Sequence, residues 1–259
     1  MTFDIRQIDL GKFNSMTKYP SILTYHALGD KGVLQDTVQI PFDGRIIGTE
    51  KVDGTNARLI FCPDQSVLVG SREDLLWERR DLIGNPAMGI VEAVKETVQR
   101  LVESLCRPGQ IAVYFVEVYG RSIGGGAKNY TKAGKVGFRL FDVVLIDDFE
   151  ELFGWPADRI AHWRDNGGQK YVNADEIVKI AGEIGFQPVP ALFDMDAAQL
   201  PTDLAGTYEF LLTFPSSRCK LDDEANGMPE GVVARSPDRS RIAKLRREDY
   251  ERTLKRRKK

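Results

Sequence analysis

The sequence predicts an α+β fold in which mainly antiparallel sheets are flanked by helices. The middle of the 259-residue chain is dominated by short β-branched runs separated by turn residues. Two longer segments repeat apolar residues at helical spacing. These helices interrupt runs of strands rather than alternating with single strands, a pattern typical of α+β proteins.

The predicted strands begin with a meander around two turns. Asp53-Gly54 separates the first two runs, and Pro63-Asp64 separates the second from the third. The predicted strands are 45–52, 56–61, 66–70, 111–119, 138–146, 208–214, 231–235 and 242–246.

The two predicted helices are 86–106 and 174–184. In the first, valines at 91, 94, 98 and 102 recur every three or four residues, and Pro108-Gly109 stops the helix. In the second, isoleucines share one face, and Gly185 follows as the expected left-handed C-cap.

Composition narrows the class of protein. The chain is 42% hydrophobic, has no apolar run of membrane-spanning length, and has charges near its N-terminus where a signal peptide is apolar. Its cysteines, Cys62, Cys106 and Cys219, are few and odd in number, which favours a reducing, cytoplasmic location without membrane contact. Only His26 and His162 are present, so lysine, arginine and carboxylates must carry any chemistry.

The C-terminal end is basic although the whole chain has a net charge of −2. From Arg241 to Lys259 there are 10 basic and 3 acidic residues, a balance of +7. The sequence therefore predicts a catalytic domain over 1–247 and a basic tail over 248–259. The tail is interpreted either as a solvated end, favoured for its last residues, or as a phosphate-binding element.

A lysine followed by a tight turn is the central candidate for chemistry. Glu50-Lys51-Val52-Asp53-Gly54-Thr55-Asn56 ends one predicted strand and starts the next. By itself this pattern fits a hairpin with an exposed lysine.

Charged residues also occur inside strands whose other residues are apolar. Glu117, Asp142 and Glu230 lie in or beside three such strands, and Lys244 and Arg246 share one face of another. Buried charges are costly unless they are paired or used. One of them alone would fit a structural ion pair, whereas several strands that each supply a polar group indicate a shared cleft.

These residues, in this order, resemble the covalent nucleotidyltransferase superfamily of DNA ligases, RNA ligases and mRNA capping enzymes. The similarity runs from Glu50 to Arg246 and implies the adenylation-domain fold of ligases. The matching elements are Lys51-Val52-Asp53-Gly54, Ser71-Arg72, Glu117, Phe141-Asp142, Glu230-Gly231-Val232-Val233 and Lys244-Leu245-Arg246.

Details near the lysine favour one branch. DNA ligases and capping enzymes usually have arginine two residues after the motif glycine, whereas Asn56 in this chain is similar to nick-sealing and RNA-editing RNA ligases, as is Glu50. The branch typically ends its last motif with lysine, where this chain has Arg246. Only 15 residues follow Lys244, so no OB domain is expected, and a partner protein is a candidate to replace it. A DNA ligase, a GTP-using capping enzyme and a catalytically silent RNA-binding relative remain alternatives.

The resemblance implies an ATP-dependent RNA ligase that joins 5′-phosphate and 3′-hydroxyl ends with Mg²⁺ or Mn²⁺. Lys51 is expected to form a lysyl-AMP, and neighbouring cations such as Lys244 and Arg246 favour its neutral amine. The resemblance also implies that Glu230 is a metal ligand, that Glu117 binds the ribose and that Arg72 binds phosphate. Asn56 is expected to bind the nucleotide or the acceptor end. Phe141 is expected to stack on adenine, with Phe138 as the alternative, and Glu50 to make a polar contact with the base.

The glycine-rich stretch from Gly120 to Lys128 does not fit a P-loop. Gly126 stands where the P-loop pattern requires lysine. It is predicted to be a loop, either mobile and near a phosphate backbone or simply a connection.

Overall fold

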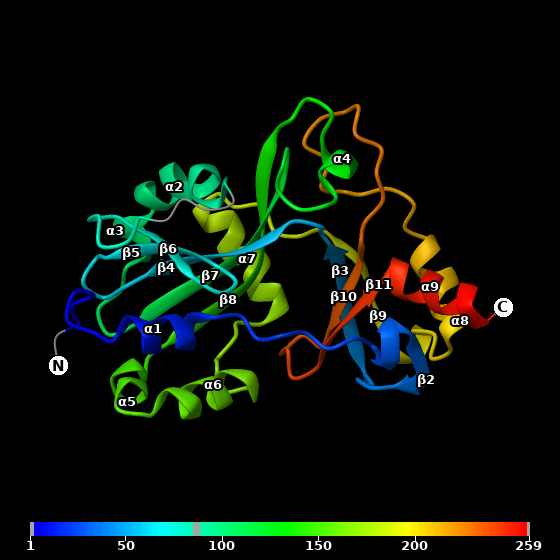
Figure 1. The fold of residues 1–259 in the computed structure, drawn as a ribbon, viewed down its shortest axis with the longest axis horizontal. Helices are drawn as coiled ribbons and strands as arrows, with labels where there is room; N and C mark the ends of the chain where they lie inside the picture. The colour runs from blue at the N-terminus through cyan, green and yellow to red at the C-terminus, as the bar shows by residue number, and fades with distance from the viewer. Residues whose placement is uncertain (1–2, 85–88, 258–259) are drawn as a thin grey trace.

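A computed structural model of the chain describes residues 3–84 and 89–257, and its two large sheets are antiparallel throughout (Figure 1). The α+β prediction is therefore confirmed. The five-stranded sheet has the order β6-β5-β4-β7-β8, the four-stranded sheet has the order β11-β10-β3-β9, and β1 pairs with β2. The strands are β1 His26–Leu28, β2 Leu34–Val38, β3 Arg45–Lys51, β4 Thr55–Phe61, β5 Val67–Ser71, β6 Leu75–Glu78, β7 Ile111–Gly120, β8 Val136–Ile146, β9 Ala191–Asp196, β10 Gly231–Arg235 and β11 Ile242–Arg246.

Helices cover both faces of the five-stranded sheet. One core cluster joins this sheet to α2, α3 and α7, and a second joins its other face to α1, α5 and α6. A third cluster packs α8 and α9 against the four-stranded sheet. The helices are α1 Leu10–Thr17, α2 Ile90–Arg100, α3 Val102–Leu105, α4 Ala127–Tyr130, α5 Phe149–Phe153, α6 Ala157–Asp165, α7 Ala174–Ile184, α8 Leu204–Leu212 and α9 Arg247–Arg257, with short 3₁₀ turns at Asp30–Gly32 and Ala197–Gln199.

The central strand β4 shows why these segments are so apolar. Leu59 and Phe61 face the first core cluster, and Ile60 faces the second. Because side chains alternate along a strand, a sheet covered on both sides requires apolar residues at every position of its central strands.

Most of the predicted elements are present. Helix α7 occupies 174–184 as predicted, and Gly185 has the left-handed φ of 73° expected of its C-cap. The predicted helix 86–106 is divided into α2 and α3 near Leu101, and its expected start at Pro86 lies outside the described residues.

The strand prediction for 208–214 is wrong, because this segment belongs to helix α8 and the turn after it. The Asp203 side chain accepts a hydrogen bond from the Gly206 amide and caps the helix N-terminus. Leu204, Thr207 and Leu211 are buried at helical spacing. This tertiary packing overrides the strand preference of the aromatic residues in the segment, Tyr208, Phe210 and Phe214.

Most of the predicted basic tail is helical, and its last described residues, 255–257, for which the sequence favours a solvated end, are exposed. Residues 247–257 form α9, in which Tyr250 and Thr253 are buried. The Thr253 hydroxyl accepts a hydrogen bond from the Leu34 amide at 2.9 Å, and the Tyr250 hydroxyl lies 2.9 Å from His26 Nδ1. The helix is therefore held against the β1–β2 hairpin by its buried apolar and hydroxyl groups, and also by Arg252, which donates to the Gly32 carbonyl oxygen, and Arg257, which pairs with Asp36.

Across the described residues, no helix combines the length and the apolar character that crossing a membrane requires.

Candidate active site

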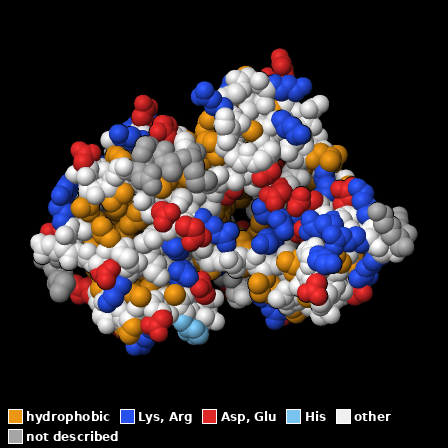
Figure 2. All heavy atoms as spheres, in the orientation of Figure 1, with side chains coloured by type: hydrophobic (Ala, Val, Ile, Leu, Met, Phe, Trp, Pro, Cys, Tyr) orange, Lys and Arg blue, Asp and Glu red, His pale blue; other side chains and the backbone are white. Residues whose placement is uncertain are grey.

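A cavity of about 830 Å³ is lined by residues from both large sheets. It lies where the chain leaves β3 in one sheet and enters β4 in the other. Acidic and basic side chains lie side by side around the hollow near the centre of the molecule (Figure 2). Eight of the predicted site residues line the cavity: Glu50, Lys51, Asn56, Arg72, Glu117, Phe141, Lys244 and Arg246.

The register of β3, β10 and β11 places Lys51, Lys244 and Arg246 close together in the four-stranded sheet. Gly231 of β10 pairs with Lys51 on one side and with Arg246 on the other. Two positions along, Val233 pairs with Thr49 and Lys244. Residues two apart share a face of a strand, so Lys51, Lys244 and Arg246 belong to the same face of this sheet.

Glu230 does not line the cavity but is ion-paired with the lysine. Its carboxylate accepts from Lys51 Nζ, and both side chains are partly buried. The Glu230 amide also donates to the Lys51 carbonyl oxygen at 3.2 Å. The predicted acid and the predicted nucleophile are therefore in direct contact.

The pKa values of Glu117 and Lys244 are shifted by burial and by neighbouring charges. Desolvation raises the pKa of Glu117 to about 7, with Glu230 also raising it and Lys51 opposing the change. Desolvation, reinforced by Arg246 and Lys51, lowers the pKa of Lys244. The cavity thus combines an acid that takes up a proton readily with a concentration of positive charge.

Glu50 points away from this cluster of cations and is fixed by hydrogen bonds. The buried carboxylate accepts from the Ser217 hydroxyl and, at 2.7 Å, from the Arg218 amide. Burial raises its pKa, although these hydrogen bonds oppose the effect. Its carboxylate therefore anchors the 217–218 segment beside β3.

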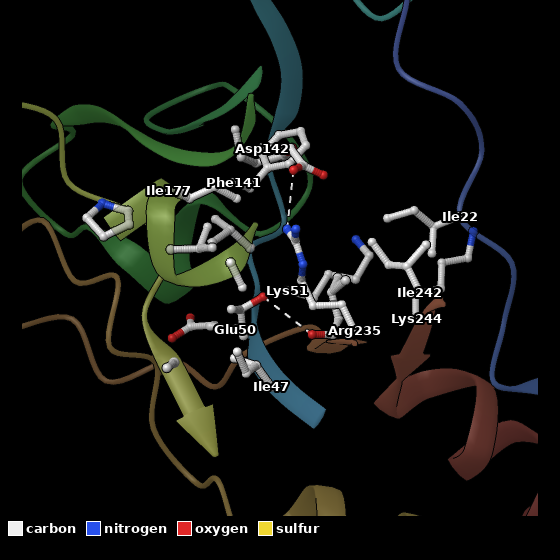
Figure 3. Close-up of a pocket in the computed structure, with 18 of the residues that line it drawn as sticks. Ile22, Ile47, Glu50, Lys51, Phe141, Asp142, Ile177, Arg235, Ile242 and Lys244 are labelled. Atoms are coloured by element: carbon white, nitrogen blue, oxygen red, sulfur yellow. Dashed lines mark hydrogen bonds and ion pairs between the residues drawn. The ribbon is translucent and has the colours of Figure 1, made fainter. Parts of the chain in front are cut away.

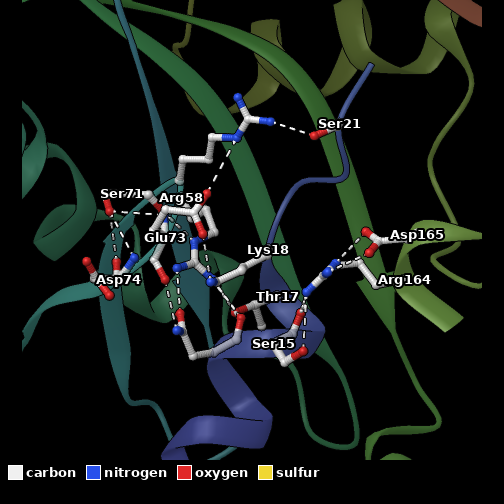
Figure 4. A network of polar contacts seen from close by, with 12 residues as sticks. Ser15, Thr17, Lys18, Ser21, Arg58, Ser71, Glu73, Asp74, Arg164 and Asp165 are labelled. Atoms are coloured by element: carbon white, nitrogen blue, oxygen red, sulfur yellow. Dashed lines mark hydrogen bonds and ion pairs between the residues drawn. The ribbon is translucent and has the colours of Figure 1, made fainter. Parts of the chain in front are cut away.

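A buried arginine supports the element that contains Arg72. Arg58 donates to the Ser71 carbonyl oxygen at 2.8 Å and to the Thr17 hydroxyl at 2.8 Å, and so joins α1 to β5 (Figure 4). Arg72 itself donates to the Ser21 hydroxyl at 2.8 Å. Two segments that are distant in sequence thus hold the arginine at the cavity.

Phe141 enters the cavity because of a β-bulge. In the pairing of β7 with β8, Phe115 pairs with Asp142 and Val116 pairs with Leu140, so Phe141 is left as the extra residue. The bulge lets Phe141 and Asp142 both line the cavity. Phe138, the alternative stacking residue, packs instead against Phe186 in the first core cluster, with ring centroids 5.2 Å apart.

The glycine-rich stretch is packed against the turn of the lysine motif. A Cβ at Gly124 would lie 2.9 Å from Gly54 Cα, and one at Gly126 would lie 2.4 Å from a carboxylate oxygen of Asp53. A Cβ at Gly54 would lie 2.4 Å from the Val118 carbonyl oxygen. Glycine is required at these positions by close approach, and the stretch supports the turn after Lys51.

The structure adds cavity residues that the sequence did not reveal. Tyr19 and Ile22 come from the segment after α1, and Arg235 comes from the end of β10. Arg235 reaches the buried carboxylate of Asp142 across the cavity at 3.3 Å (Figure 3). The Asp142 carboxylate also accepts from the Tyr19 hydroxyl at 2.8 Å. These contacts join segments more than 90 residues apart, and nothing in the local sequence indicates them.

The donor atoms fit a nucleotide with its metal ion. Asn56 Oδ1 is buried without a hydrogen-bond partner, as expected of an atom that awaits a ligand. Among the described residues no group of three or more His, Cys, Asp or Glu side chains is placed to hold a metal. The carboxylate of Glu230 fits Mg²⁺ or Mn²⁺ when phosphate oxygens and water complete the coordination.

Comparisons with known proteins identify a family and a similar fold. The family model described as RNA ligase matches residues 44–255. The fold is similar to that of a Naegleria gruberi RNA ligase with PPi (TM-score 0.56, 18% identity, 93% of this chain and 59% of that one). It is also similar to an archaeal ATP-dependent RNA ligase (TM-score 0.56, 16% identity, 90% and 49%) and to a variant of the Naegleria gruberi ligase with ATP and Mn (TM-score 0.53, 19%, 91% and 64%).

The chain spans about half to two thirds of the length of these solved structures. No curated protein sequence gives a significant match.

Proposed function

The chain belongs to the RNA ligase family, and we propose that it is an ATP-dependent ligase that joins the 5′-phosphate and 3′-hydroxyl ends of RNA. The observation that carries this proposal is the cavity in which Lys51, Glu117, Lys244 and Arg246 converge, with Glu230 paired to the lysine.

The first step is attack by the neutral amine of Lys51 on the α-phosphorus of ATP. A bond forms between Nζ and phosphorus, the bond to the bridging oxygen breaks, and pyrophosphate leaves with the electron pair. The amine must first lose a proton. The Glu230 carboxylate, which accepts a hydrogen bond from Nζ, is placed to accept the proton.

The second and third steps transfer and release AMP. An oxygen of the RNA 5′-phosphate attacks the lysyl-AMP phosphorus and displaces Lys51. The RNA 3′-hydroxyl then attacks the activated 5′-phosphorus, forms the phosphodiester and expels AMP. The donors of Arg72, Lys244 and Arg246 stabilise the negative charge that develops on phosphate oxygens during each step.

The nucleotide is oriented by residues around the phosphate site. Phe141, presented by its bulge, stacks on adenine, and Glu117 accepts hydrogen bonds from the ribose hydroxyls. Asn56, with its unpartnered oxygen, binds the nucleotide or the acceptor end. A Mg²⁺ or Mn²⁺ ion held by Glu230 would neutralise phosphate charge and polarise the α-phosphate.

The decisive experiment is covalent labelling. The protein is incubated with α-labelled ATP or GTP and a divalent metal, then separated by denaturing electrophoresis. ATP should label the wild-type chain and Lys179→Ala, an exposed control on α7, but not Lys51→Ala. Glu230→Ala should lose labelling by at least about a hundredfold, the effect typical of removing one group that stabilises transition-state charge.

Two of the alternatives give different results in the same experiment. Labelling by GTP alone would indicate a capping-type nucleotidyltransferase, and no labelling by either nucleotide would indicate a silent RNA-binding relative. The third alternative requires a separate joining assay, in which a preference for 5′-phosphorylated DNA over RNA would indicate a DNA ligase.

A further inference from the structure

A buried carboxylate holds the last basic residue of the site. Arg246 Nε donates to Asp249 Oδ2 at 2.7 Å, and Arg246 Nη2 donates to Asp249 Oδ1 at 3.1 Å. This is the two-point geometry that only a guanidinium can make with a carboxylate. Asp249 lies in the first turn of α9, and only 1% of its side chain is exposed, whereas 30% of the Arg246 side chain is exposed.

Resting on the proposed function, we propose that Asp249 is a positioning residue, which acts through Arg246 on the phosphates of the nucleotide. Asp249 does not line the cavity, and Arg246 does. The carboxylate therefore has no direct route to a ligand, and its effect must pass through the guanidinium.

The pair leaves the arginine able to bind phosphate. A guanidinium has five N–H donors. Asp249 engages two of them, and the remaining N–H groups of a side chain that lines the cavity are free to meet phosphate oxygens. A lysine ammonium is a single point of charge on a flexible stem and cannot be fixed in this way. Arginine at position 246 and a carboxylate at 249 therefore form one functional unit.

The position of Asp249 is itself fixed by the packing of α9. Its neighbour Tyr250 is buried, and the Thr253 hydroxyl accepts a hydrogen bond from the Leu34 amide at 2.9 Å, so α9 holds Asp249 in place without Arg252, the other partner of its carboxylate. On the other side of Arg246, Gly231 separates it from Lys51 in the cross-strand row. The C-terminal helix is thus connected to Lys51 through Asp249, Arg246 and Gly231.

The competing explanation is a purely structural pair. An acidic residue in the first turn of a helix interacts favourably with the helix dipole and with an arginine three residues before it, whatever the function. In that case Asp249 would affect stability, and its effect on the reaction would be independent of Arg246.

A double-mutant cycle separates these explanations. The variants are Asp249→Asn, Arg246→Gln and the double mutant, and Arg252→Gln is the matched control because it removes the other partner of Asp249. The measurement is the single-turnover rate of labelling by ATP, together with the melting temperature of each variant. We expect Asp249→Asn to slow labelling about a hundredfold, the cost typical of misplacing a group by about 1 Å. In the Arg246→Gln background the same change should have almost no further effect, and Arg252→Gln should label at nearly the wild-type rate.

Equal losses from Asp249→Asn in both backgrounds would overturn the proposal, as would a loss of the same size in Arg252→Gln. If Asp249→Asn fails to fold, Asp249→Glu takes its place in the cycle, because it keeps the charge but moves the carboxylate. The same predictions and the same refutation then apply.

A binding measurement distinguishes failure of this inference from failure of the proposed function. The cycle is repeated in the Lys51→Ala background by titration calorimetry with ATP, which requires no reaction. If the wild-type chain is never labelled, the proposed function is wrong. Weaker ATP binding by Asp249→Asn only when Arg246 is present would still support the positioning role, and unchanged binding would refute it.

Discussion

Replacing Glu117 by glutamine should stabilise the folded protein at pH 8 and impair its reaction with ATP. Glu117 pairs with Asn56 across β4 and β7 at the cavity, where burial raises its pKa from an ordinary value of 4.5 to about 7. Glutamine keeps the size and polarity of the side chain and removes the charge. The folded protein at pH 8 therefore no longer holds an ionised carboxylate in a place that disfavours it.

The expected gain follows from the difference between the folded and ordinary pKa values. One pH unit corresponds to about 1.4 kcal/mol, so the difference between 4.5 and about 7 gives about 3 kcal/mol. Because the folded pKa is the higher one, the folded state binds this proton more tightly. The cost of ionisation is absent below about pH 4.5, grows between 4.5 and 7, and is complete above 7. The advantage of glutamine should follow the same curve.

The assay is urea denaturation of the wild type and Glu117→Gln at pH 8, 6.5 and 5. Glu103→Gln, on the exposed face of α3, is the matched control and should show almost no difference at any pH. Labelling by ATP at pH 8 is measured on the same samples. It should fall in Glu117→Gln although the protein is more stable, as expected where a site maintains an unfavourable charge for function.

Two results would refute this reasoning. One is a Glu117→Gln variant no more stable than the wild type at pH 8. The other is a stability gain that does not shrink as the pH falls. Either would mean that the ionised carboxylate is not costly in this cavity.

Three further predictions concern stacking, helix packing and RNA. Phe141→Ala should weaken ATP binding about tenfold to a hundredfold, as measured by calorimetry. Phe138→Ala should leave ATP affinity unchanged and lower the free energy of unfolding in urea by up to about 3 kcal/mol. Thr253→Val removes the acceptor of a buried β2 amide and should cost about 1–3 kcal/mol in urea denaturation. Lys255→Gln with Arg256→Gln should leave ATP labelling intact and reduce the logarithmic salt slope of single-stranded RNA binding by about 0.7 per lost contact; an unchanged slope would remove these residues from the RNA-binding surface.

The sequence by pattern alone indicated the candidate site residues, because these residues have local signatures. Lys51 stands beside an Asp-Gly turn, and Glu117 interrupts an otherwise apolar strand. A charge in such a strand is visible without a structure, since burying it is costly unless it is used or paired. The same logic identified Lys244 and Arg246 by their alternation with apolar residues. Strands and α7 were predictable because their apolar periods match their burial.

Tertiary structure alone decided how these residues are held. Phe141 enters the cavity through a bulge that depends on pairing with β7, and α8 forms because its apolar residues pack against the four-stranded sheet. Tyr19 reaches the site through its contact with Asp142, 123 residues away in the sequence, which local sequence patterns do not indicate. Periodicity and composition report the burial of a residue within its own element. They do not report which distant element covers it, because that depends on the packing of the whole chain.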